Sequence, residues 1–294
     1  MDRLPYLFCD AVIGTISDLY GLSEQIKLFD NSRFSTWKSA LEDHNSNRQK
    51  LELCIGFVDG EWSYEFEKFD HTEGESLFYD FNTVQQVRTK TFQIISVDYT
   101  NDLKRYNSSF EEIEEITKFI TPYVNLVSLE LYYNNQIEEN DLSSLLSLFR
   151  NAQCQVYSLT VDHHRKCCED LLLTHMRSDF LKYLHIKGEN WPKEIQLGLE
   201  EFVLKKSFES VYCARSNFVF KMSFFEKLFK LPKPKEEMRF DGKFSIDLKE
   251  LKEYKKDLQI HAVTDSILTW EREDGMRLSL SDLSDHLQID IIPQ

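Results

Sequence analysis

The sequence has little glycine and lacks the motifs that usually mark an active site. Its 9 glycines are scattered, and neither G-x-G-x-x-G nor G-x-x-x-x-G-K occurs, so a phosphate-binding loop is not expected. The metalloprotease pattern H-E-x-x-H and the hydrolase pattern G-x-S-x-G are absent as well. The sequence therefore predicts a protein that is not an enzyme and that needs no cofactor.

Positive charge and long apolar runs are also scarce. The chain has 35 basic and 50 acidic residues, a formal charge of −15, which repels phosphate backbones and argues against nucleic acid or an anionic membrane as a partner. No apolar run is long enough to cross a bilayer. The first stretch, LPYLFCDAVIGTISDL, contains Asp10 and is a poor secretory leader. The 6 cysteines lie mostly in apolar runs, as buried thiols of a reducing compartment do, so we expect a cytoplasmic or nuclear protein.

Residues 1–44 have a helical period. Apolar residues recur at helical spacing in three short stripes, and Pro5 suits the first turn of the first helix. Three helices of this size are marginal alone. The sequence predicts a small helical domain over residues 1–46 that buries its remaining apolar surface against something else.

The period changes to that of strands after this segment. Apolar residues alternate on both sides of Asp59-Gly60, which predicts a β-hairpin over residues 51–66. A second hairpin is expected over residues 265–281, around Asp274-Gly275. We assign residues 47–294 to one β/α domain with a hairpin at each end.

Between the hairpins, at about residues 92–260, a pattern apolar-x-x-apolar-x-apolar recurs at intervals of 25 to 34 residues, with helical stripes between its copies. The copies are Phe92/Ile95/Val97, Leu126/Leu129/Leu131, Val156/Leu159/Val161, Leu181/Leu184/Ile186 and Phe208/Val211/Cys213. This period favours an irregular solenoid similar to leucine-rich repeats, with parallel strands. Asn134 occupies the consensus asparagine position, but His164, Glu189 and Ser216 replace it later. An ordinary sheet of βαβ units is the alternative.

Side chains between the apolar positions should form rows on the outer face of stacked strands. The rows are Ser128/Ser158/Tyr183/Ser210, Glu130/Thr160/His185/Tyr212 and Tyr132/Asp162/Lys187/Ala214. Tyrosine, histidine and charged residues together are typical of a recognition surface. The alternative is that tyrosine is simply common in exposed strands, whether or not they bind a partner. We expect a protein-binding site that includes Glu130, Tyr132, Asp162, Tyr183, His185, Lys187 and Tyr212.

The cluster HHRKCC, residues 163–168, contains metal-ligand residue types. A structural zinc site needs a second pair of ligands, and no C-x-x-C or H-x-x-x-H follows. We therefore expect no metal site. The two histidines should lie in a loop, with Cys167 or Cys168 packed under the next helix.

The beginning of the chain resembles an F-box, which opens with Leu-Pro and ends near a tryptophan. The features that carry the resemblance are Leu4-Pro5, the stripe through Val12, Ile13 and Ile16, and FSTW at residues 34–37. With MDRLPYLFCDAVI, LSEQ, RFSTWK and SNRQKLELCIGF ahead of a β/α body, the layout is similar to the F-box families that are expanded in nematodes. Phe-Ser-Thr-Trp replaces the usual Ser-Lys/Arg-x-Trp, and the distance from Leu4 to Trp37 is longer than is common.

The resemblance implies a specific function. F-box helices dock on a Skp-family adaptor, which connects to a cullin-RING ubiquitin ligase, and the C-terminal domain captures the target protein. By the motif match, the adaptor-binding residues would be Leu4, Pro5, Val12, Ile13, Leu22 and Trp37. The expected function is that of a non-catalytic substrate receptor; a repeat scaffold without a ubiquitin role is the alternative.

Overall fold

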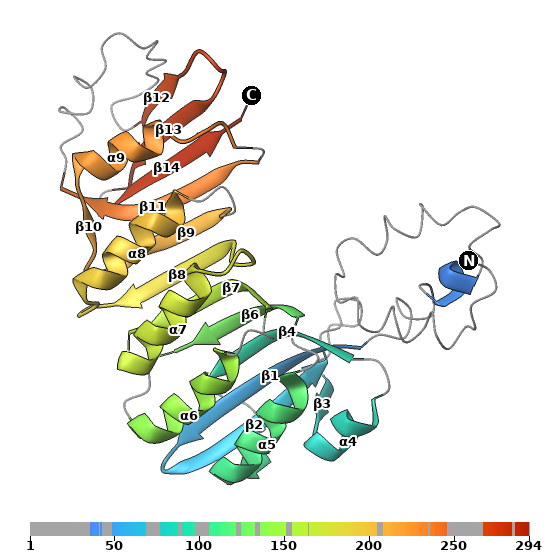
Figure 1. The fold of residues 1–294 in the computed structure, drawn as a ribbon. Helices are drawn as coiled ribbons and strands as arrows, with labels where there is room; N and C mark the ends of the chain where they lie inside the picture. Colours follow the sequence, from blue (N-terminus) through green and yellow to red (C-terminus); the bar gives the residue numbers. More distant parts are fainter. Residues whose placement is uncertain are drawn as a thin grey trace. The chain divides into compact units, whose positions relative to one another are not determined.

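The computed structural model describes residues 36–40, 42, 49–68, 77–87, 90–97, 106–121, 125–132, 136–150, 155–163, 165–204, 208–234, 236–245, 267–283 and 286–293. These residues form a mixed α/β fold whose strands lie in open sheets (Figure 1). The chain divides into unit 1, Met1–Val156, and unit 2, Tyr157–Gln294. Most of the predicted N-terminal domain lies outside the described residues, and the described part, residues 36–40 and 42, is helical.

Unit 1 begins with the hairpin that the sequence predicts. Strands β1 (Gln49–Val58) and β2 (Glu61–Lys68) are antiparallel. Asp59 and Gly60 form the turn with φ of 54° and 85°, the left-handed values that a tight hairpin turn needs. Side chains of β1 and β2 that point to the same face are buried: Leu51, Leu53, Ile55, Trp62, Tyr64 and Phe66. The hairpin prediction is confirmed.

The sheet of unit 1 continues with parallel strands. β4 (Lys90–Val97) pairs with β1, and β6 (Asn125–Leu131) pairs with β4. Helices α5 (Phe110–Ile120) and α6 (Glu139–Phe149) contact each other. Each buries an apolar stripe; the buried residues are Ile113, Ile116, Ile120, Leu142, Leu145, Leu146 and Phe149.

Helix α5 illustrates how local sequence sets an element boundary. Ser109 caps the helix by accepting a hydrogen bond from the backbone N–H of Glu112, at 3.2 Å. Glu111 and Glu112 lie in the first turn and Lys118 in the last, as the helix dipole favours. The acidic run is therefore part of a helix start.

Short elements at the outer edge of β2 were not predicted. β3 (Leu77–Tyr79) and β5 (Tyr106–Ser108) both pair with β2, and α4 (Phe81–Gln86) follows β3. Strands this short contain no alternation that sequence reasoning can detect.

Unit 2 alternates strand and helix (Figure 1). The order is β7 (Gln155–Asp162), α7 (Lys166–Met176), β8 (Tyr183–Gly188), α8 (Lys193–Val203), β9 (Ser210–Ser216), β10 (Val219–Phe220), α9 (Met222–Phe229) and β11 (Met238–Phe244). The first two residues of β7 belong to unit 1. Strands β7, β8, β9 and β11 are parallel neighbours, and β10 pairs with the end of β11. The last three copies of the repeated pattern fall on β7, β8 and β9, with Leu181 and Phe208 just before their strands. All three apolar positions of each copy are buried, as predicted.

Three antiparallel strands complete the sheet of unit 2. β12 (Ile267–Glu271) and β13 (Arg277–Asp282) form the predicted C-terminal hairpin, with Gly275 at φ 79°. β14 (Leu287–Ile292) was not predicted; it lies between β13 and β11. The sequence feature that could have predicted β14 is the alternation of Leu287, Ile289 and Ile291, all of which are buried. No described helix has the length and apolar character needed to span a bilayer.

Two glycines have nearly the same backbone conformation but different surroundings. Gly60 has φ +85°, and an added Cβ would have no heavy atom within 4 Å. Gly188, at the end of β8, has φ +87°, and an added Cβ would lie 3.1 Å from the backbone nitrogen of His163. At Gly60, glycine is favoured only because other residues are strained at positive φ. At Gly188, glycine is favoured for the same reason and also because the backbone of His163 lies too close for a side chain.

Alanine at these two glycines should separate the two costs. We expect Gly60→Ala to lower the free energy of unfolding by about 1 kcal/mol, because alanine is strained at positive φ. Gly188→Ala should cost more than Gly60→Ala, because the added methyl group also crowds His163. Denaturant titration of both variants measures the difference, and equal losses would show that the loop can move away from Gly188 freely.

Candidate functional site

The face of the unit 2 sheet that points away from α7, α8 and α9 carries most of the predicted binding residues. We call the side chains of β7, β8, β9 and β11 on this side the open face of unit 2: Ser158, Thr160, Asp162, Tyr183, His185, Lys187, Ser210, Tyr212, Arg215, Arg239 and Asp241. The strand register aligns Ser158, Tyr183 and Ser210 in one row, and Thr160, His185 and Tyr212 in the next. Both predicted rows are confirmed over these three strands. The pairing of β11 with β9 adds Arg239 to the first row and Asp241 to the second.

The third row differs from the prediction at one position. Asp162 pairs with Lys187 as expected, but Lys187 pairs with Arg215 and not with Ala214. The register shifts between His185 and Lys187, so β9 contains one extra residue at this point. The sequence does not reveal this bulge because Cys213 and Ala214 are both small and both buried.

At one end of the open face, Tyr183 pairs with Tyr157, a β7 residue outside the set just defined. The rings of Tyr157 and Tyr183 meet edge to face, with centroids 5.9 Å apart. The hydroxyl of Tyr183 donates to Glu209, whose other carboxylate oxygen accepts from Nζ of Lys182 at 2.6 Å. This hydrogen bond, together with burial, raises the pKa of Tyr183 to about 12. Tyr183 is 39% exposed, and its hydroxyl hydrogen bond holds the ring in place on the surface of the sheet. Glu209 was missed because a single acidic residue at a strand start has no periodic signal.

The centre of the open face is occupied by His185. Its ring lies edge to face against Tyr212 at a centroid distance of 4.5 Å. Its Nε2 is buried and has no hydrogen-bond partner among the described residues. Desolvation, followed by the charges of Lys187 and Arg215, lowers the pKa of His185 to about 4. The imidazole is therefore neutral at physiological pH.

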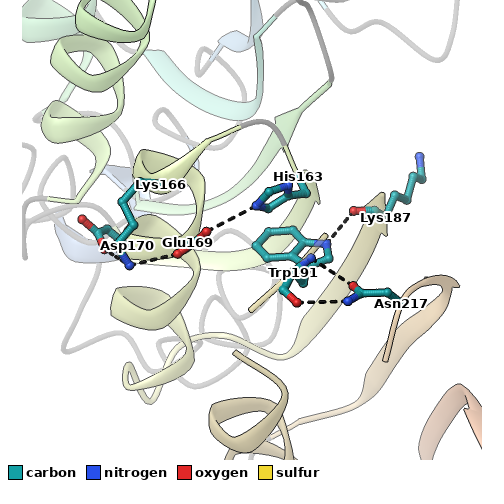
Figure 2. Close-up of polar contacts among 7 residues, drawn as sticks. All are labelled: His163, Lys166, Glu169, Asp170, Lys187, Trp191 and Asn217. Atoms are coloured by element: carbon teal, nitrogen blue, oxygen red, sulfur yellow. Dashed lines mark hydrogen bonds and ion pairs between the residues drawn. The ribbon is translucent and has the colours of Figure 1, made fainter. Parts of the chain in front are cut away.

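Hydrogen bonds between successive loops fix the backbone at the end of β8 (Figure 2). The carbonyl of Lys187 accepts two, from the backbone N–H of His163 at 3.1 Å and from Nε1 of Trp191 at 2.8 Å. The side chain of Asn217 accepts from the backbone N–H of Trp191 and donates to its carbonyl, both at 3.0 Å. These contacts connect the loops after β7, β8 and β9, while the side chain of Lys187 points away from them (Figure 2).

The HHRKCC segment takes part in this packing. His163 stacks edge to face on Trp191 at 4.7 Å, and its Nε2 lies 3.3 Å from Glu169, which also pairs with Lys166 at 2.9 Å. Burial was predicted for Cys167 or Cys168, and both are buried, as members of α7 itself. Within the described ranges, no group of three or more metal-ligand side chains comes together.

The described cysteines with a shifted pKa lack the character of activated nucleophiles. Burial raises the pKa of Cys54 to about 11 and raises that of Cys213 further. The hydrogen bond with Cys168 is the main cause that raises the pKa of Cys167. A thiolate is therefore disfavoured at each of these three positions.

The remaining predicted binding residues belong to unit 1. Glu130 lies on β6, and Tyr132 follows that strand and donates from its hydroxyl to Glu130 at 2.6 Å. Glu130 is in register with Ser96 of β4, which is in register with Cys54 of β1. Glu52 lies on the same face of β1, and desolvation, then the charges of Glu67 and Glu130, raise its pKa to about 7.

Most of the predicted adaptor-binding residues cannot be placed. Leu4, Pro5, Val12, Ile13 and Leu22 lie outside the described residues. Trp37 is in the helical stretch 36–40 and is half-buried, and Ala40 in the same stretch is fully buried. The adaptor site stays a prediction.

The state of His185 can be tested by pH. Because its folded pKa, about 4, is below the ordinary 6.5, the unfolded chain binds the proton more readily, and stability should fall as pH drops from 6.5 to 4. We expect this side chain to contribute a loss on the order of 1–2 kcal/mol, since partial exposure screens the effect. NMR titration of His185 measures the pKa, and His185→Gln should flatten the pH dependence of unfolding. A measured pKa near 6.5 would contradict the described environment.

Glu52 should show the opposite pH dependence. Its pKa is raised from 4.5 to about 7, so its contribution to stability is full below pH 4.5 and is lost as pH rises through 7. Glu52→Gln should therefore stabilise the protein by on the order of 1 kcal/mol at pH 8 and have little effect at pH 4.5. Thermal unfolding at both pH values measures this, with Glu115→Gln, an exposed position on α5, as the control. No gain at pH 8 would contradict the crowding of carboxylates around Glu52.

Three comparisons, with protein-family models, with curated proteins and with solved structures, give no match to this chain.

Proposed function

We propose that the protein is a non-catalytic substrate receptor of a Skp–cullin–F-box ubiquitin ligase, in which the N-terminal helices bind the adaptor and the repeat strands bind the target. The observation that carries the target-binding half is the open face of unit 2. It presents aligned rows of aromatic, imidazole and charged side chains on neighbouring parallel strands. The resemblance of residues 4–37 to an F-box carries the adaptor half.

A leucine-rich-repeat-like architecture fits the described strands better than an ordinary βαβ sheet does. In a sheet covered by helices on both faces, central strands are apolar on both sides. In β7 and β8, by contrast, buried residues alternate with partly exposed polar ones, so only one face is covered. Asn217, one position after Ser216, connects neighbouring loops much as the consensus asparagine of such repeats would. The three antiparallel strands after β11 supply a cap to the repeats.

The surface chemistry of the open face suits protein recognition. Tyrosine rings and arginine are enriched where protein interfaces bind most tightly. The hydroxyl of Tyr183 donates a hydrogen bond to Glu209, and the side chain of Lys187 projects from a backbone whose carbonyl accepts two hydrogen bonds. Because these groups are already positioned, a partner loses less free energy in ordering them.

The adaptor half of the proposal rests on a simple physical expectation. A helical domain of about 40 residues exposes more apolar surface than it can bury within itself. A Skp-family adaptor would cover that surface and connect the receptor to a cullin. Leu4, Pro5, Val12, Ile13, Leu22 and Trp37 are the residues assigned to this contact.

Complex formation with the adaptor tests the proposal. The full-length protein, mixed with a purified Skp-family adaptor at micromolar concentration, should elute with it as one complex. Replacing Pro5 and Ile13 with charged residues should abolish co-elution, because a charge on an apolar contact loses its hydration without a partner. Size-exclusion chromatography with light scattering measures the outcome.

Two controls make the result specific. Tyr183→Ala together with Lys187→Glu lies in unit 2 and should leave the adaptor complex intact. Circular dichroism should show that the Pro5 and Ile13 variants remain folded. If the unmodified protein elutes alone, the ubiquitin role fails, and a repeat scaffold that binds proteins without a ligase becomes the better explanation.

A further inference from the structure

The bulge in β9 creates an unusual pair of charges. Lys187 of β8 and Arg215 of β9 are directly opposite each other on neighbouring strands. Like charges in this arrangement repel and destabilise a sheet. Arg215 is exposed, and both cations are close enough to His185 to lower its pKa. The sheet therefore concentrates positive charge at one point of a chain whose net charge is −15.

The charges around this point do not balance. Asp162 is in register with Lys187 on the side opposite to Arg215, so it can offset one of the two cations. The neighbours of His185 in its own row are Thr160 and Tyr212, which are neutral. Beyond Tyr212, Asp241 lies 3.8 Å from His286 and is therefore already close to a basic group. Among the described residues of these rows, the positive charge near Arg215 has no second carboxylate in register.

A second cation on the same face provides a contrast. Arg239 of β11 extends the first row, and its Nε donates to Asp290 of β14 at 2.8 Å. An arginine on this sheet is thus paired across the strands where the chain supplies a carboxylate. At Arg215 the in-register neighbour is Lys187, a second cation.

We propose that Lys187, Arg215 and His185 form a binding site for an acidic segment of a target protein, with a glutamate or aspartate carboxylate seated between the two cations. The site rests on the proposed function, since its ligand belongs to the captured protein. A carboxylate there would relieve the repulsion between Lys187 and Arg215, and guanidinium groups bind carboxylates through paired hydrogen bonds. Tyr183 at the start of β8 and Tyr157 of β7 would contact apolar side chains of the same segment.

The His185 ring provides a way to detect a ligand at this site, through a change in its pKa. Nε2 has no hydrogen-bond partner among the described residues. The groups that face the ring are Thr160, Tyr212, Lys187 and Arg215, with Asp162 beyond Lys187. A bound carboxylate adds a negative charge to this set and should raise the pKa of His185.

Peptide binding tests the proposal directly. The probe is a fluorescent Gly-Ser peptide that carries a central run of glutamates, with matched peptides in which glutamine, lysine or phosphoserine replaces them. At low salt, fluorescence anisotropy should show that the glutamate peptide binds the full-length protein about tenfold or more tightly than the glutamine peptide, as a charge-assisted contact allows. Binding should weaken with added salt.

Matched variants locate the contact. Arg215→Gln should weaken glutamate-peptide binding about tenfold, the loss of one charged hydrogen bond, and Arg215→Lys should lose less. Arg239→Gln is the control, because this arginine is on the same face but is already paired with Asp290. NMR should show the pKa of His185 rising when the glutamate peptide is added. Arg215 is exposed, so its substitution should leave the fold unchanged, which circular dichroism can check.

Several results would overturn the site. Equal binding of the glutamate and glutamine peptides, unchanged binding in Arg215→Gln, or an equal loss in Arg239→Gln would each contradict it. Tighter binding of the phosphoserine peptide would replace a carboxylate ligand with a phosphorylated one. The adaptor experiment is independent: loss of adaptor binding with Arg215-dependent peptide binding would remove the ubiquitin role but keep the site.

Discussion

Each β/α repeat of this protein has one apolar face that it cannot cover alone, and this constraint determines the rest of the described structure. In unit 2 the apolar triplets associated with β7, β8 and β9 are buried, and so are the apolar stripes of α7, α8 and α9. Because helices cover one side only, the same strands leave their other side half-exposed in unit 2. The open face is therefore a consequence of how the repeats bury their cores.

The open face combines fixed groups with an electrostatically costly one. Tyr183 and the backbone of Lys187 are held by hydrogen bonds, whereas Arg215 faces another cation. A purely structural surface gains nothing from such repulsion, whereas a bound carboxylate would relieve it. This local positive charge lies in a chain whose overall composition is acidic.

Periodicity predicted the repeated elements well. The triplets ending in Val161, Ile186 and Cys213 mark strands where the structure has them, and the helical stripes between them mark helices. Both hairpins followed from Asp-Gly turns, because a positive φ at glycine is a local requirement visible in the sequence. Short edge strands such as β3 and the extra residue before Arg215 were missed, because a three-residue strand or a single bulge leaves no repeating pattern. The predicted rows place Tyr183, His185 and Lys187 correctly along β8, but the partners that define their chemistry, Glu209 and Arg215, come from tertiary register.

The double role of the Lys187 carbonyl has an evolutionary consequence. One oxygen receives hydrogen bonds from the loop before it and from the loop that follows its own strand, and Asn217 extends the connection to the next loop. The loop after β8 contacts the loops on both sides, so an insertion there would disturb two neighbours, whereas an insertion after β7 or β9 would disturb only its contact with the loop after β8. The hydrogen bonds between these loops do not involve the half-exposed side chains of the rows. Point substitutions in the rows would thus change the surface of the sheet without any change in the lengths of the connecting turns.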